Sequence, residues 1–109
     1  MKYEYRQAVQ RVLAKHHARL ELGLSRSREQ EPFVMRVAAC LHRAAIPYYL
    51  QLTDDLDAVF VVPSSYTSSI HTLLACMGGI DVGKESFGWV VSDAAQAHIQ
   101  VQIMWETQQ

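Results

Sequence analysis

The chain has 109 residues, half of them hydrophobic and 19% charged, which is the composition of one ordinary globular domain with a real core. This balance excludes a disordered chain, and a net charge of −1 with two cysteines argues against both a strongly basic nucleic-acid binder and a disulfide scaffold. The polar start lacks an apolar stretch behind it, and residues 58–80, although free of Asp, Glu, Lys and Arg, are too rich in Ser and Thr to span a membrane. We therefore expect one cytoplasmic domain over residues 1–109, without membrane contact.

The charges are divided unevenly along the chain. Residues 1–45, the basic helical half, hold nine Lys and Arg against four Asp and Glu, a balance of +5. Residues 46–109, the acidic sheet half, hold one base, Lys84, against seven acids, a balance of −6. This split is the strongest non-random feature of the sequence, and it points to electrostatic contact with a partner or between the halves.

Two helices are predicted in the basic half. Residues 3–22 repeat apolar side chains at steps of three and four and end before Gly23, a natural residue for a helix C-terminus. Residues 24–31 predict a polar linker, and Pro32 then suits the first position of a second helix that Pro47 terminates. The expected apolar positions are Tyr5, Val9, Val12, His16 and Leu20 in the first helix, and Phe33, Val34, Val37, Ala38, Leu41 and Ala45 in the second.

The acidic half changes to a period of two, which indicates strands. Residues 48–52 and 56–62 predict a hairpin around residues 53–55, and Ser64 or Ser65 begins a helix that Gly78 and Gly79 end. Two or three further strands are predicted, at 80–82, 86–91 and 97–106. The last strand alternates, so one face of the sheet is packed and the other is wet or contacts a partner. The order ααββαβββ predicts an α+β domain with a mostly antiparallel sheet of four to five strands.

The segment GGIDVGKES, residues 78–86, is one residue short of a P-loop, because Glu85 stands where the motif needs Ser or Thr. A P-loop follows a strand and opens a helix, whereas here a predicted helix leads into Gly78 and a strand follows. A helix end and a tight turn around residues 82–84 explain the same residues, so we expect no nucleotide site and no cofactor.

The segment TDDLDAVFVV, residues 53–62, carries Asp55 and Asp57 where a strand is predicted to begin. Residues two apart in a strand share a face, and paired carboxylates can hold Mg²⁺. Locally the segment resembles the Asp-x-Asp strand of the nucleotidyltransferase superfamily, without the glycine turn that precedes the pair there. The resemblance implies Asp55 and Asp57 as metal ligands, with Glu106 as the third acid. A solvated acidic turn is the alternative.

The histidines and cysteines give no recognisable site. Adjacent His16 and His17 diverge on a helix, and no pair has the spacing of zinc ligands. Cys40 and Cys76 are expected to be free thiols buried on apolar helix faces.

The first helix carries the basic residues on which we base the functional prediction. Arg11, Lys15 and Arg19 are spaced four apart and stack along one side, with Arg6 nearby in sequence. This stripe could be merely solvated, could dock on the acidic half within the chain or across a dimer, or could bind an acidic partner.

We expect a small non-enzymatic regulatory, adaptor or inhibitor module that contacts an acidic protein through Arg6, Arg11, Lys15 and Arg19 or through the polar face of the last strand. Self-association through the sheet edge or the first helix would give a homodimer. A minimal metal-dependent enzyme using Asp55 and Asp57 is the alternative from another class. Nucleic-acid binding through the first helix is a further alternative, although a pI near 6.5 and the predicted linker at 24–31 argue against it.

Overall fold

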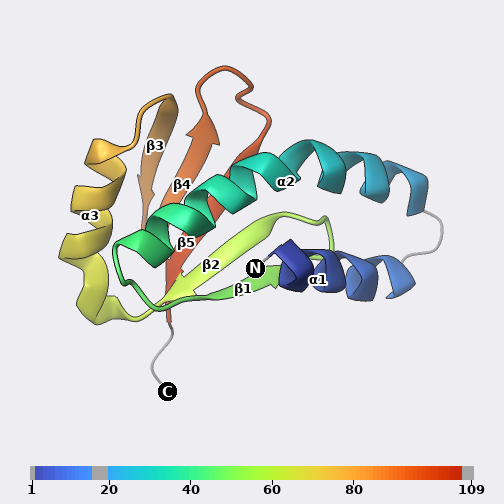
Figure 1. Ribbon diagram of the computed structural model, residues 1–109, viewed down its shortest axis with the longest axis horizontal. Coiled ribbons are helices and arrows are strands. Elements are labelled where there is room, and N and C mark those ends of the chain that lie inside the picture. Colours follow the sequence, from blue (N-terminus) through green and yellow to red (C-terminus); the bar gives the residue numbers. More distant parts are fainter. Residues whose placement is uncertain (1, 16–19, 107–109) are drawn as a thin grey trace.

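The computed structural model describes residues 2–15 and 20–106. Three helices lie on one side of a five-stranded sheet, and the predicted α+β class and element order are confirmed (Figure 1). The elements are α1 (Lys2–Lys15), α2 (Leu20–Arg43), β1 (Tyr49–Leu52), β2 (Ala58–Val62), the short 3-10 turn η2 (Ser64–Tyr66), α3 (Thr67–Cys76), β3 (Ile80–Glu85), β4 (Gly88–Asp93) and β5 (Gln100–Trp105). No helix of the described part is long and apolar enough to cross a membrane.

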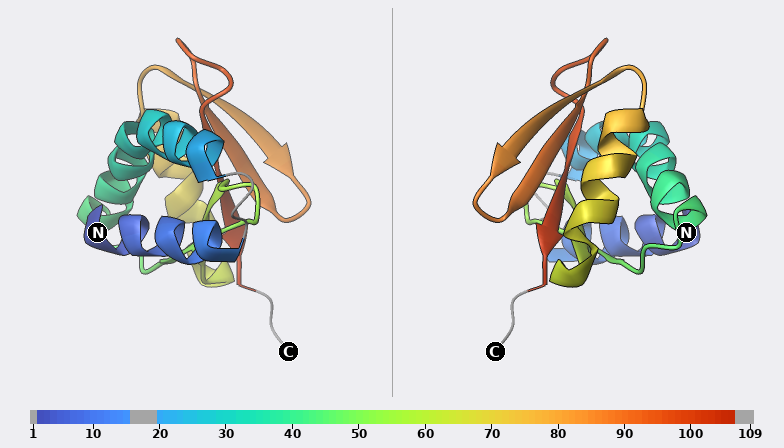
Figure 2. Two further views of the ribbon diagram at one scale, coloured as in Figure 1. Left: turned by 90° about the vertical axis from the view of Figure 1, so that its right-hand side faces the viewer. Right: turned by 90° about the vertical axis from the view of Figure 1, so that its left-hand side faces the viewer.

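The sheet has the strand order β1-β2-β5-β4-β3. The β2–β5 pair is parallel and every other neighbouring pair is antiparallel. Phe60 of β2 lies opposite Ile103 of β5, and both side chains are fully buried under the helices. The three helices cover this face, and no described helix covers the other (Figure 2).

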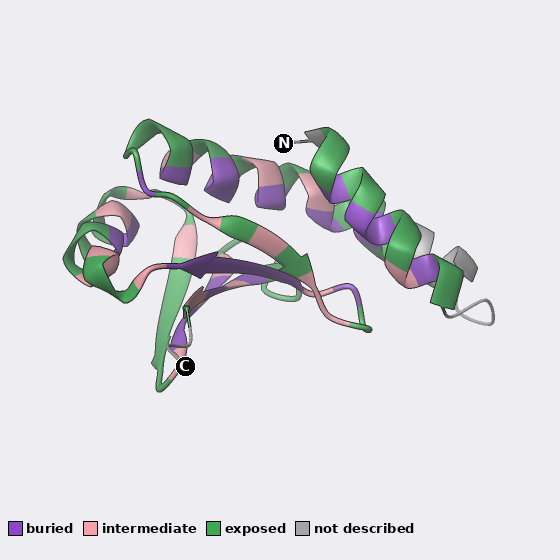
Figure 3. Ribbon diagram, turned by 90° about the horizontal axis from the view of Figure 1, so that it is seen from below, coloured by how far each residue is buried: buried purple, intermediate pink, exposed green. Residues whose placement is uncertain are grey.

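The helices bury one stripe each against the sheet (Figure 3). In α1 the stripe contains Tyr5, Val9 and Leu13, all at most 4% exposed. Tyr5 and Val9 were predicted, whereas Leu13 takes the buried position expected of Val12, which is half-buried. The predicted His16 and the side chain of Leu20 lie outside the described part of the chain. In α2 the buried positions include Val34 and Leu41, whereas Ala45, expected on the same face, lies exposed beyond the end of the helix. The buried side chains of both halves of the chain form one shared core.

The predicted linker at residues 24–31 is wrong, because α2 begins at Leu20 and runs through Gly23 and Pro32. Pro32 removes one helical hydrogen bond, yet tertiary contacts secure the turns before it. The Tyr5 hydroxyl donates to the Ser27 carbonyl at 3.1 Å, and the Gln30 amide donates to the Tyr5 oxygen at 3.2 Å and to the Leu56 carbonyl at 2.5 Å. Ser27 and Gln30 are therefore buried polar residues of a helix and not loop residues.

The tight turn predicted at residues 82–84 is also misplaced. Gly83 and Lys84 lie inside β3, and the turn between β3 and β4 is Ser86-Phe87. Gly88 opens β4 at φ +148°, where a side chain would collide with the backbone of β5. The chain therefore turns later than predicted because this glycine is the one that permits close approach to the central strand.

Candidate functional site

The predicted basic stripe is split between two sides of α1. Arg6 faces α2 and forms a two-pronged ion pair with Glu31, with its Nη2 2.9 Å and its Nε 3.2 Å from the carboxylate oxygens. This carboxylate raises the pKa of the Arg6 guanidinium above its ordinary value, first through the hydrogen bond and then through its charge. Arg6 therefore links α1 to α2 through an ion pair and does not belong to the exposed basic stripe.

Arg11 and Lys15 lie on another side of the same helix. Five residues of helix place Arg11 about 140° around the axis from Arg6. Both side chains are exposed, and neither forms an ion pair within the described residues. We call Arg11 and Lys15 the basic flank; Arg19, predicted as its third member, lies outside the described residues.

Part of the basic half does dock on the acidic half, through residues of α2 that the sequence did not single out. Arg26 pairs with Asp57 in the turn before β2, and Arg36 donates to the Gly78 carbonyl after α3. His98, in the loop before β5, lies 2.6 Å from the Glu29 carboxylate. Internal docking thus uses α2, while Arg11 and Lys15 remain exposed on α1.

The three predicted metal ligands are not brought together. Strand β2 begins at Ala58, so Asp55 lies in the turn and Asp57 just before the strand, paired with Arg26. Because β2 and β5 run parallel, Glu106 lies at the far end of β2, where its backbone N–H donates to the Val62 carbonyl at 2.7 Å. Among the described residues no group of three or more His, Cys, Asp and Glu could hold a metal ion.

The two cysteines are free thiols, and Cys76 is exposed, contrary to the predicted burial. It is the last residue of α3 and lies about 160° around the helix axis from the buried Leu74, so it faces outward. Cys40 is half-buried, and the Arg43 guanidinium lies 3.6 Å from its sulfur.

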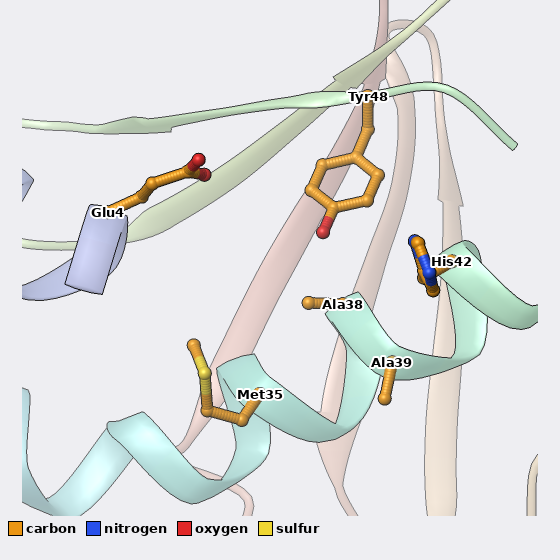
Figure 4. Close-up of a pocket in the computed structure, with 6 residues that line it drawn as sticks. All are labelled: Glu4, Met35, Ala38, Ala39, His42 and Tyr48. Carbon is orange, nitrogen blue, oxygen red and sulfur yellow. The ribbon is translucent and has the colours of Figure 1, made fainter. Parts of the chain in front are cut away.

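A pocket with a volume of about 450 Å³ lies between α1, α2 and Tyr48, the residue just before β1 (Figure 4). Its lining residues are Glu4, Met35, Ala38, Ala39, His42 and Tyr48. The Tyr48 hydroxyl points into the pocket, with Glu4 on one side and His42 on the other. Burial raises the pKa of Tyr48 above its ordinary value, and the Glu4 charge adds to the effect, so this hydroxyl stays a neutral hydrogen-bond donor.

The uncovered face of the sheet carries the polar side of β5, as predicted. Gln100 and Gln102 point away from the helices, opposite to the buried Val101 and Ile103. On β3, the residues of this face include two acids, Asp81 and Glu85, and none of the strand positions facing this way is Lys or Arg. This face therefore presents amides and acids around the apolar side chains of Val59, Val61 and Val90, and the basic flank presents the opposite charge elsewhere on the molecule.

Comparison with family models, with curated proteins and with solved structures finds no match for this chain.

Proposed function

We propose that this chain is a small non-enzymatic regulatory, adaptor or inhibitor module that binds an acidic protein surface through the basic flank of α1. The observation that carries the proposal is the exposure of Arg11 and Lys15 on a helix that is otherwise firmly seated. Two cations one helical turn apart repel each other by a few tenths of a kcal/mol, which a partner's carboxylates would relieve.

The seating of α1 supports this role because it holds the basic flank in place before a partner arrives. One side of α1 buries Tyr5, Val9 and Leu13. On another side, Arg6 forms its ion pair with Glu31 of α2. A surface that is already ordered loses little conformational entropy on binding. Exposed cations at fixed positions chiefly raise the association rate and select against basic partners.

We also propose that the protein acts in the cytoplasm and that it can form a homodimer. A second copy of the chain offers acids on β3, at the sheet edge, that are complementary to the basic flank. Self-association through that edge or α1 would appear as a concentration-dependent molar mass in light scattering. A mass of 12.4 kDa at all concentrations would remove the dimer and leave binding to another protein.

The proposal is tested by capture from native-host lysate with matched variants. Arg11→Ala with Lys15→Ala keeps the helix, since Ala is the best helix former, and removes both cations of the flank. Arg28→Ala with Arg43→Ala removes two exposed cations of α2 and serves as the charge-matched control. We expect the first pair to weaken capture of an acidic protein by at least about tenfold and the control pair to change it by less than about threefold.

Equal capture by both pairs of variants would overturn the proposal, provided that circular dichroism shows both folded. Nucleic-acid binding would contradict it in a different way. In that case the flank variants would lose a gel shift that weakens steeply with rising salt, because phosphate contacts release counterions. A heat of Mg²⁺ binding in titration calorimetry, lost in Asp57→Asn, would instead support the metal-dependent alternative.

A further inference from the structure

A second site lies at the end of the sheet, where three strands place Lys84, Trp89 and Trp105 together. The Lys84 ammonium lies 4.3 Å from the centroid of the Trp89 ring and 4.5 Å from that of Trp105. The two indole rings meet edge to face, with centroids 5.1 Å apart and planes at 63°. One cation therefore contacts two tryptophan faces at distances typical of cation–π attraction.

The register of the sheet explains why these side chains meet. Lys84 lies opposite Trp89 across the β3–β4 pair, so both point to the same face. Trp105 lies next to the β3–β4 turn, since its backbone N–H donates to the Phe87 carbonyl at 3.0 Å. The position of Lys84 inside β3, which a turn at residues 82–84 would have prevented, is what brings its ammonium over the rings.

The three residues differ in exposure, with the aromatic rings inside and the lysine covering them. Trp89 is only 2% exposed, Trp105 is half-buried, and Lys84 is exposed. Lys84 is thus the outermost member and can leave without unpacking the core. Within the described residues, Trp105 Nε1 is a buried donor that has no hydrogen-bond partner, so no hydrogen bond fixes this indole ring in place.

We propose that Trp89 and Trp105 form a site for a trimethylammonium group, and that Lys84 occupies this site as an internal competitor. A primary ammonium is strongly hydrated, whereas a quaternary ammonium has lost its N–H donors and favours aromatic faces. No other base of the acidic half would repel a bound cation, because Lys84 is the one Lys or Arg of residues 46–109.

The test uses tryptophan fluorescence, because Trp89 and Trp105 are the two tryptophans of the chain and the whole indole signal reports on this site. The probe is choline, titrated at physiological salt into the wild type, Lys84→Ala and Lys84→Arg. The neutral control is 3,3-dimethyl-1-butanol, which has the shape of choline without its charge. An internal competitor lowers the apparent affinity by the fraction of molecules in which the site is open.

We expect choline to bind Lys84→Ala about three- to tenfold more tightly than the wild type, with Lys84→Arg close to the wild type. The neutral alcohol should change the fluorescence of none of them, and Trp105→Leu added to Lys84→Ala should abolish the choline response. Equal choline affinity in the wild type and Lys84→Ala would overturn the proposal. An equal response to choline and to the neutral alcohol would overturn it as well, since the charge would then play no part.

Discussion

Replacing Gly88 by Ala is predicted to destabilise the protein severely. A Cβ at Gly88 would lie 2.0 Å from the Ile103 carbonyl oxygen, 3.0 Å from its carbon and 3.1 Å from the Met104 Cα. All three atoms belong to the backbone of β5, which is paired on both sides and cannot retreat without loosening β2 or β4. The φ of +148° adds strain for any residue with a Cβ.

The cost has two parts. Strain at the unfavourable φ contributes about 1–3 kcal/mol. Moving the start of β4 away from Met104 gives up about two ladder hydrogen bonds at about 1 kcal/mol each. The sum, about 3–5 kcal/mol, is a large part of the 5–15 kcal/mol expected for a whole domain. At about 4–8 °C per kcal/mol, the Tm should fall by at least about 12 °C.

Urea unfolding followed by tryptophan fluorescence measures this loss, with far-UV circular dichroism as an independent probe of cooperativity. Gly83→Ala is the matched control on the adjoining strand, because its Cβ would meet nothing closer than the Val90 carbonyl oxygen at 3.9 Å. The control should change the free energy of unfolding by less than about 1 kcal/mol. A loss of unfolding free energy in Gly88→Ala no larger than that in Gly83→Ala would show that no steric clash with β5 exists.

Three further predictions concern the helical layer and the cysteines. Gln30→Ala should cost about 2–3 kcal/mol in urea unfolding, because it deprives the Leu56 carbonyl and the Tyr5 hydroxyl of a donor, whereas exposed Gln10→Ala should cost less than about 0.5 kcal/mol. Burial raises the pKa of Tyr5, so the fold favours the neutral phenol; this stability is present below pH about 10 and is lost as the pH rises further. Thermal melts from pH 8 to 11 should therefore fall less steeply in Tyr5→Phe than in the wild type, and equal slopes would contradict the assignment. A thiol reagent should modify exposed Cys76 before half-buried Cys40, and a fast phase that survives Cys76→Ser would show the opposite order.

The arrangement of elements followed from local patterns in the sequence. Apolar steps of three and four predicted Tyr5 and Val9 of α1 and the buried face of α2 up to Leu41, and alternation predicted which side of β5 is packed. Gly78 and Gly79 do separate α3 from β3, with Gly79 at φ +70°. These features depend on neighbours within one turn or one strand, so the sequence alone was sufficient for them.

The wrong predictions concern residues whose position is set by contacts with distant parts of the chain. Residues 24–31 look like a linker because Ser27 and Gln30 are polar, yet their partners Tyr5 and Leu56 lie more than twenty residues away and hold them in α2. The placement of Glu106 depends on β2 and β5 being parallel, since an antiparallel pair would have set Glu106 beside Asp57. No local pattern reveals that direction.

The predicted basic stripe shows the same limit. The four-residue spacing of the basic residues does not reveal that Arg6 pairs with Glu31 of α2. Nor does it reveal that Arg11 and Lys15 remain exposed. The cluster of Lys84 with Trp89 and Trp105 was missed because it requires the register of three strands. The sequence did single out Lys84 as the one base of the acidic half. It gave no sign that Trp89 and Trp105 would lie beside it.

Site-specific photo-crosslinking can show whether the outward side of α1 contacts an acidic protein, as we propose. Ala14 is exposed on α1 between Arg11 and Lys15 in sequence, and Ala75 is an exposed alanine of α3 that serves as the control position. A photoreactive residue at 14 should crosslink to an acidic segment of a partner, and the crosslink should disappear in the Arg11→Ala, Lys15→Ala background. A crosslink of equal yield from position 75, or one from position 14 that survives removal of both cations, would contradict the claim.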